Sequence, residues 1–219
     1  MYFFKKIVVG PLETNCYLAA NPETKETVIF DPGAGAETIK ETIREEQLKP
    51  VAILLTHAHF DHIGAVKNLV TEYHIPVYIG EEERRVLSEL ASVLPSPFYE
   101  REKRRDLYLV DADIFVKDEE LLELGGMYIT CLHTPGHTEG GYSYFFPTEQ
   151  TVICGDTLFM ESIGRTDFPT GDETQLINSI REKLFNLPDE TKVFPGHGPA
   201  TNIEYEKRYN LYARISRRK

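Results

Sequence analysis

The chain has 219 residues, of which 41% are hydrophobic, and it carries a formal net charge of -11. This length and hydrophobic content suffice to bury a sizeable core, and we predict a single domain over residues 1–219 because no internal linker interrupts the sequence. The acidic balance argues against a nucleic-acid partner, since binding a phosphate backbone requires a basic surface. No apolar stretch before Pro11 is long enough for a signal peptide or a membrane span, so we expect a cytoplasmic protein without membrane association.

The first half of the chain alternates between strand-like and helix-like segments. Short apolar runs predict strands at residues 2–9, 15–20, 26–30 and 51–55, and an amphipathic segment predicts a helix at about residues 36–47. After the last of these strands, five apolar residues recur at helical spacing: Ile63, Val66, Leu69, Val70 and Tyr73. This spacing predicts a helix that covers a sheet with its apolar face.

A charged segment follows the strand-like residues 76–79. Residues 81–94 have helical character, which two prolines end at Pro95 and Pro97. Strand-like runs resume beyond residue 111, and residues 172–186 predict another amphipathic helix. Strands on both sides of helix-forming segments indicate sheets that pack face to face with helices outside. The three cysteines fall in apolar, strand-like segments and are predicted to be reduced thiols.

Three imidazoles and a carboxylate follow the apolar run at residues 51–55 within the segment from Thr56 to His62. Residues two apart in an extended chain share a side, so His57, His59 and Asp61 can face one cavity, and His62 turns toward it as a helix begins. This pattern predicts a metal site at a strand end. Because zinc usually takes about four ligands, the site requires further ligands from elsewhere in the chain.

Three later segments share one pattern, in which an apolar run is followed by a glycine and then by a candidate ligand. The runs are residues 127–132, 151–154 and 192–194, the glycines are Gly136, Gly155 and Gly196, and the ligands are His137, Asp156 and His197. Glycine permits a tight turn and a close backbone approach, which places a short ligand side chain just beyond the carboxyl end of a strand. We therefore expect all seven ligand side chains on one rim.

These motifs resemble those of metallo-β-lactamase-fold hydrolases, specifically the short, single-domain relatives of glyoxalase II. The resemblance is carried by Asp31–Gly33, Thr56–His62, Thr134–Thr138, Gly155-Asp156, Gly164–Phe168 and Pro195–Gly198. It implies an α+β fold, a four-layer αββα sandwich in which two mixed β-sheets pack face to face with helices outside. It also implies one metal ion held by His57, His59 and His137, a second held by Asp61, His62 and His197, and Asp156 as a bridge between them.

Two further residues near these ligands have a predicted role. The resemblance implies that Asp31 hydrogen-bonds to a metal ligand and so orients it, and this is our prediction; the alternative from the residues alone is a turn residue before Pro32. His133 precedes the turn that aims His137, and we predict that it is a local hydrogen-bonding group and not an eighth ligand.

Two adjacent divalent ions predict a hydrolytic chemistry. A water that bridges them loses a proton near neutral pH, which provides a hydroxide nucleophile without a basic side chain. Asp61 would orient this hydroxide in addition to binding metal. We expect zinc, with iron or manganese as alternatives, because imidazole and carboxylate ligands suit all three metals. The predicted activity is hydrolysis of a thioester, with S-lactoylglutathione or a related acyl-thiol as the small-molecule substrate.

Other activities are compatible with the same motifs. The Gly164–Phe168 segment is also similar to that of persulfide dioxygenases, which use one iron, and hydrolysis of a lactone or another ester requires the same ligand set. Arg165 is a candidate substrate-binding residue that could meet a carboxylate, and its alternative is a structural ion pair with Asp167 or Asp172. Glyoxalase II proper has a carboxyl-terminal helical domain that helps hold glutathione, and we expect that domain to be absent because the chain ends soon after His197.

Residues 92–111 are the part of the chain that least resembles the family. Their aromatic and basic side chains, which include Arg101, Arg104 and Arg105, predict either a wall of the substrate cleft that attracts an anionic acyl-thiol or a solvated surface loop. The sequence leaves that choice and the oligomeric state open.

Overall fold

The structure is a computed structural model, and it describes residues 1–84 and 111–214. Three of the predictions concern segments that lie largely or wholly outside these residues. They are the helix at residues 81–94, of which only the first four residues are described, the arrangement of residues 92–111, of which only Asp111 is described, and the role of Arg101, Arg104 and Arg105.

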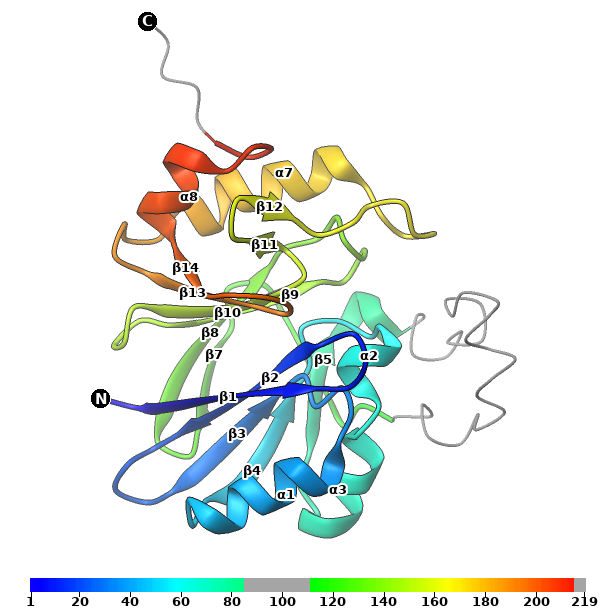
Figure 1. The fold of residues 1–219 in the computed structure, drawn as a ribbon, viewed down its shortest axis with the longest axis vertical. Coiled ribbons are helices and arrows are strands. Elements are labelled where there is room, and N and C mark those ends of the chain that lie inside the picture. Colours follow the sequence, from blue (N-terminus) through cyan, green and yellow to red (C-terminus); the bar gives the residue numbers. More distant parts are fainter. Residues whose placement is uncertain (85–110, 215–219) are drawn as a thin grey trace, which may run out of the picture.

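The first of two mixed sheets is built from the amino-terminal half of the chain (Figure 1). Its strands lie in sequence order: β1 (Phe3–Val9), β2 (Thr14–Ala20), β3 (Glu26–Phe30), β4 (Lys49–Leu54), β5 (Val77–Gly80) and β6 (Ile114–Val116). The strands from β1 to β3 pair antiparallel, and those from β3 to β6 pair parallel. The parallel strands β4 and β5 are connected by the histidine-rich segment, which therefore lies at the carboxyl edge of the sheet.

The second mixed sheet comes from the carboxyl-terminal half. In spatial order its strands are β14 (Thr201–Asn202), β13 (Lys192–Pro195), β10 (Thr151–Gly155), β9 (Tyr142–Phe146), β8 (Met127–His133) and β7 (Leu121–Leu124). Strands β10 and β13 are parallel, with Ile153 opposite Phe194 and Gly155 opposite Pro195. Their carboxyl ends therefore meet at one edge of the sheet. A separate small hairpin pairs β11 (Leu158–Phe159) with β12 (Ser162–Ile163).

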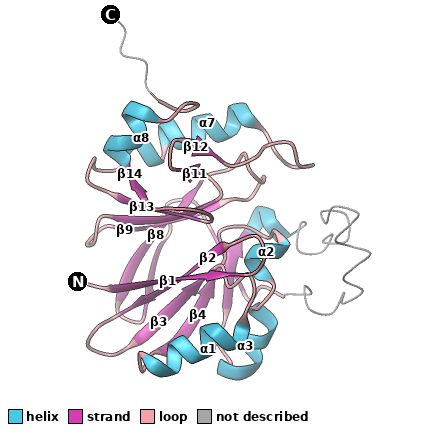
Figure 2. Cartoon of the chain, viewed as in Figure 1, coloured by secondary structure: helices cyan, strands magenta, loops and turns pink. Residues whose placement is uncertain are grey.

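Helices cover the outer face of each sheet (Figure 2). Helices α1 (Ala36–Glu45) and α3 (Val66–Tyr73) lie outside the first sheet, and α7 (Glu173–Glu182) and α8 (Ile203–Tyr209) lie outside the second (Figure 1). The four layers enclose three apolar cores, one between the sheets and one beneath each helix layer. Strand β2 contributes to two of these cores, because successive side chains of a strand point to opposite faces of the sheet. Cys16 and Leu18 face the core under α1, and Tyr17 faces the core between the sheets. The predicted four-layer sandwich with two mixed sheets is confirmed.

The helix predicted from Ile63 to Tyr73 is in fact two helices. A short helix, α2 (Phe60–Ile63), ends at Gly64, and α3 begins at Val66. The backbone amide of Ala65 donates to the carbonyl of Pro32 at 2.8 Å instead of continuing the helix. A Cβ atom on Gly33 would lie 1.5 Å from the carbonyl oxygen of Asp61, so the chain at residues 32–33 packs directly against the break. Tertiary contact with this turn interrupts a pattern that is helical in sequence.

The predicted helix at residues 172–186 is also shorter than expected. Helix α7 ends at Glu182, and a separate 3-10 helix, η3, covers Leu184–Asn186. All three cysteines are free and buried, as predicted. Among residues 1–84 and 111–214, no helix is long and apolar enough to cross a membrane.

Candidate metal centre

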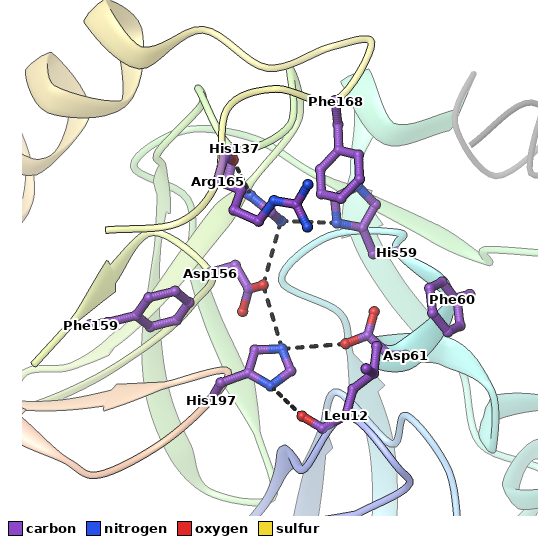
Figure 3. A pocket seen from close by; sticks show the side chains of 10 residues that line it. All are labelled: Leu12, His59, Phe60, Asp61, His137, Asp156, Phe159, Arg165, Phe168 and His197. Atoms are coloured by element: carbon purple, nitrogen blue, oxygen red, sulfur yellow. Dashed lines mark hydrogen bonds and ion pairs between the residues drawn. The ribbon is translucent and has the colours of Figure 1, made fainter. Parts of the chain in front are cut away.

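The seven predicted ligand side chains come from four segments that follow strands of both sheets. His57, His59, Asp61 and His62 follow β4, while His137, Asp156 and His197 follow β8, β10 and β13, respectively. Because these strands end at the same side of the sandwich, the structure brings all seven side chains into one cluster (Figure 3 shows five of them).

All three glycines in the apolar-run pattern have the close contacts that the sequence predicted, and two of them lie against a ligand segment. Gly155 has a φ of 51°, and a Cβ atom there would lie 2.2 Å from the hydroxyl of Thr56. A Cβ atom on Gly196 would lie 2.1 Å from Oδ1 of Asp156. Only glycine leaves room for the neighbouring ligand segments at these two positions.

The cluster divides into two groups, each of which could hold one metal ion. We call them site A, formed by His57, His59 and His137, and site B, formed by Asp61, His62 and His197; within each group one ligand atom per residue lies within 4.8 Å of the others. In site A, Nε2 of His137 lies 2.9 Å from Nδ1 of His59. In site B, Oδ2 of Asp61 lies 3.3 Å from Nε2 of His197 and 3.6 Å from Nε2 of His62.

Asp156 lies between the two sites. Its Oδ1 is 3.5 Å from Nε2 of His62. Its Oδ2 is 3.5 Å from Nε2 of His137 and 3.5 Å from Nε2 of His197 (Figure 3). The carboxylate thus faces ligands of site A and site B at once, which is the arrangement that a bridging ligand requires.

Hydrogen bonds on the far side of four imidazoles leave Nε2 free to face the centre. The hydroxyl of Thr56 donates to Asp31 at 2.6 Å, so the hydrogen bond of 3.0 Å between Thr56 and Nδ1 of His57 must be donated by the imidazole. Nδ1 of His62 donates to Asp31 at 3.0 Å. Nδ1 of His137 donates to the Arg165 carbonyl at 2.6 Å, and Nδ1 of His197 donates to the Leu12 carbonyl at 3.0 Å.

Three of the atoms that face the centre are buried without a hydrogen-bond partner in the described part of the chain. Nε2 of His57, Nε2 of His62 and Oδ1 of Asp156 all lack a hydrogen-bond partner among the described residues. Buried polar atoms are rarely left unpaired, and these three converge on the same small space. Imidazole nitrogen and carboxylate oxygen are ligands that suit zinc, iron and manganese, so the donor set fits a pair of divalent ions.

Asp31 and Thr56 connect the two sites. The Asp31 carboxylate accepts from the backbone amide of Thr56 at 2.8 Å as well as from its hydroxyl and from His62. Both oxygens of Asp31 therefore accept hydrogen bonds from the protein, although one of them also lies within 4.8 Å of ligand atoms of His57 and His62. It makes the predicted hydrogen bond to a ligand of site B, and through Thr56 it also reaches His57 of site A. The role of Thr56 was not predicted; its only signal in the sequence is its position directly before His57.

Charges in the cluster favour neutral imidazoles in site A and positive charge in site B. Burial lowers the pKa of His57 and His137, and burial with the neighbouring His137 lowers the pKa of His59 to about 3. Burial alone would also lower the pKa of His62, but the carboxylates of Asp156 and Asp61 outweigh it and raise that pKa to about 10. The carboxylates that outweigh burial at His62 would also favour a bound cation in site B.

A cleft of about 290 Å³ opens over the cluster. Its floor is formed by residues of sites A and B with Asp156, and its walls are largely apolar (Figure 3). The wall residues are Leu12, Phe60, Phe159, Phe168 and the rim residue Arg165. Phe168 packs edge-on against His59, with ring centroids 5.1 Å apart. The aromatic walls were not predicted as site residues.

Arg165 lies at the rim of this cleft with its side chain 68% exposed. Its guanidinium donates two hydrogen bonds to Asp167, at 2.9 Å and 2.8 Å, and lies 4.6 Å above the ring of Phe168. Asp172 instead caps α7 by accepting from the amide of Gln175 at 2.9 Å. Of the two predicted ion pairs of Arg165, the structure contains the one with Asp167. Arg165 also borders the cleft.

His133 does not join the cluster. Its Nε2 hydrogen-bonds to the carbonyl of Glu139 at 3.1 Å, and its ring lies 5.0 Å from that of Tyr142. This is the local hydrogen-bonding role that the sequence predicted.

The chain is similar to known proteins in both sequence and structure. Residues 9–197 match the model of a family described as the metallo-beta-lactamase superfamily. A probable metallo-hydrolase, YqgX, of Bacillus subtilis is 38% identical over 95% of this chain and 96% of its own length. The hydroxyacylglutathione hydrolase GloC of Haemophilus influenzae is 38% identical over 94% of this chain and 95% of its own. A crystal structure of the BLEG-1 B3 metallo-beta-lactamase superposes with a TM-score of 0.84 at 41% identity, over 96% of this chain and 99% of that one.

Proposed function

Because this chain belongs to the metallo-beta-lactamase superfamily and is a metallo-hydrolase, we propose that it hydrolyses thioesters, with S-lactoylglutathione or a related acyl-thiol as substrate. The observation that carries the proposal is Asp156, whose two oxygens face both metal-binding groups at the floor of a cleft. When bound, a pair of divalent ions supplies a hydroxide nucleophile at neutral pH and stabilises the carbonyl oxygen as it gains negative charge.

The side chains of this protein would hold and orient that pair. Four imidazoles donate their Nδ1 protons outward, to Thr56, Asp31 and two backbone carbonyls, and so keep Nε2 directed at the centre. Oδ2 of Asp61 accepts from the hydroxyl of Thr14 at 3.1 Å, which orients a carboxylate that we propose both binds metal and aligns the nucleophile.

The cleft walls support an acyl-thiol as the substrate. Phe159 and Phe168 line the cleft, so an acyl chain and a thioether-like sulfur would bury apolar surface there and displace water. The relative from Haemophilus influenzae, whose name states hydrolysis of hydroxyacylglutathione, supports a thioester in particular. We further propose that the substrate is a small molecule and that neither nucleic acid nor a membrane is a partner.

A second candidate is hydrolysis of a cyclic amide or ester bond. It is favoured by the likeness to a structure named as a B3 metallo-beta-lactamase, which is 41% identical. The same ligand groups would serve either reaction, so the difference must lie in the leaving group that the cleft accepts.

The deciding experiment supplies the purified, metal-analysed protein with S-lactoylglutathione and measures release of free thiol. The matched substrates are an oxygen ester with the same acyl group, a thioester of a different thiol, a β-lactam and a glutathione persulfide with oxygen uptake as its readout. We expect metal-dependent thiol release that exceeds turnover of the oxygen ester. Oxygen uptake, or hydrolysis of the lactam or oxygen ester without thiol release, would refute the proposal.

The ion pair between Arg165 and Asp167 at the rim of the cleft leads to a prediction about the charge of the substrate. Asp167 competes with any substrate carboxylate for the guanidinium of Arg165. In Asp167→Asn we expect the KM for an anionic thioester to fall by about two- to five-fold, with kcat unchanged, because only uniform binding is gained. A neutral thioester with the same acyl group is the control. An equal change in KM for both substrates would show that Arg165 does not contact the substrate.

A further inference from the structure

Glu83 is a fully buried acidic residue close to the candidate metal centre. It ends the 3-10 helix η1 (Glu81–Glu83), directly after β5, and its exposed fraction is 0%. The preceding residues Glu81 and Glu82 are exposed. A buried carboxylate is costly unless hydrogen bonds compensate for its lost hydration, so the contacts of Glu83 indicate its role.

The carboxylate of Glu83 bridges two backbone segments. Its Oε2 accepts from the amide of Ala58 at 3.1 Å, and its Oε1 accepts from the amide of Gly140 at 3.2 Å. Ala58 lies between His57 and His59, and Gly140 lies three residues after His137. Glu83 therefore connects the two segments that together supply every ligand of site A.

The packing around this bridge leaves little freedom. A Cβ atom on Gly140 would lie 2.5 Å from the backbone nitrogen of Glu83 and 2.8 Å from its Cγ. A Cβ atom on Gly80 would lie 2.7 Å from the carbonyl oxygen of Gly140. The loop after β8 thus contacts η1 directly, and the carboxylate fills the space between that loop and the segment after β4.

Site B has separate supports. His62 donates to Asp31, His197 donates to the Leu12 carbonyl, and Asp61 accepts from Thr14. These contacts come from the segment after β3, from the loop between β1 and β2, and from the first residue of β2. Among the described residues, Glu83 makes no hydrogen bond to any of them.

We infer that Glu83 is a positioning residue, which holds the two ligand-bearing segments of site A at the separation that metal binding requires. The inference rests on the metal-binding part of the proposed function. The inference predicts that substitution of Glu83 weakens metal binding at site A and not at site B. A general loss of stability would not produce this difference between the two sites.

The test is Glu83→Gln in the full-length protein. Glutamine has the same shape but a single side-chain acceptor, so it can accept from Ala58 or from Gly140 while its amide group faces the other N–H. Metal-free protein is titrated with Zn²⁺ against a chromophoric chelator, which resolves two binding steps, and with Co²⁺, whose absorption spectrum reports ligand geometry. The His137→Ala variant identifies which step and which absorption bands belong to site A.

We expect the Zn²⁺ affinity of site A to fall by about 10- to 100-fold in Glu83→Gln, and that of site B to change by less than about two-fold. The Co²⁺ bands of site A should shift or weaken while those of site B remain. Glu82→Gln, the same substitution on the exposed neighbour, should match the wild type. Glu83→Asp retains the charge but is one methylene too short for both amides, so it should weaken site A as well.

The outcomes separate this inference from the proposed function. If the wild type binds two ions and both Glu83 variants bind them as Glu82→Gln does, the positioning role is wrong while the proposed function stands. Equal weakening of both sites, or a lower melting temperature with unchanged affinities, would also overturn it and make Glu83 a general structural residue. Wild-type protein that binds no metal would overturn the metal centre and this inference together.

Discussion

Asp156→Ala is expected to remove both metal ions and to lower kcat/KM by about 10³-fold or more, which corresponds to about 4 kcal/mol of transition-state stabilisation. The reason is the position of its carboxylate, which lies 3.5 Å from ligand nitrogens of His62, His137 and His197. Among the predicted ligands in the described residues, it is the one whose carboxylate lies 3.5 Å from ligand nitrogens of both sites. Its loss also removes a negative charge from a cluster of five imidazoles, which weakens the attraction for a cation at both positions.

The measurement is metal content per chain by elemental analysis, together with kcat/KM for the substrate that the thiol-release assay identifies. Asp189→Ala is the matched control, because Asp189 is a carboxylate on the surface that pairs with Lys207. That variant should keep wild-type metal content and activity. An Asp156→Ala protein that retains two ions per chain would show that Asp156 is not a bridge.

Replacing one terminal histidine at a time should empty one site selectively. His137→Ala is expected to lose the ion of site A, and His197→Ala the ion of site B, because each imidazole belongs to only one of the two groups. We expect metal content to fall by about one equivalent in each variant and kcat/KM to fall by about 10²-fold or more, since a dinuclear centre needs both ions for full catalysis.

Site identity is read from the Co²⁺ spectrum and activity from thiol release. His133→Ala is the control, because His133 bonds locally to the Glu139 carbonyl and is outside the cluster. Loss of the same absorption bands in the His137 and His197 variants would contradict the division into two sites. Loss of a metal equivalent in His133→Ala would show that His133 is itself a metal ligand.

Most of the helices and strands predicted from local patterns in the sequence are present in the structure. The apolar run in β2 and the helical spacing in α1 and α7 are local properties, and each is visible in the printed sequence. The helix predicted from Ile63 to Tyr73 differed from the structure because of a distant segment. The carbonyl of Pro32 takes the amide of Ala65 and so divides the expected helix into α2 and α3.

The candidate ligands could be found from the sequence because their chemistry is tied to position along the chain. When a histidine or aspartate comes just after an apolar run and a glycine, the preceding strand and the glycine turn set the direction of its side chain locally. What surrounds those ligands depends on which segments meet in space. Thr56 shares its hydroxyl with Asp31 and His57. The walls Phe159 and Phe168 reach the cleft from the segments after β10.

The role of Glu83 is the clearest example of a feature that cannot be predicted from the sequence. In the sequence it is the last of three successive glutamates, and nothing distinguishes it from Glu81 and Glu82, which are exposed. Only the tertiary structure buries its carboxylate between the amides of Ala58 and Gly140. The candidate metal ligands can be identified from the sequence, because ligand chemistry and strand ends are local properties. The residues that orient them are visible only in the folded chain, because hydrogen bonds such as that from Thr56 to Asp31 join segments 25 residues apart.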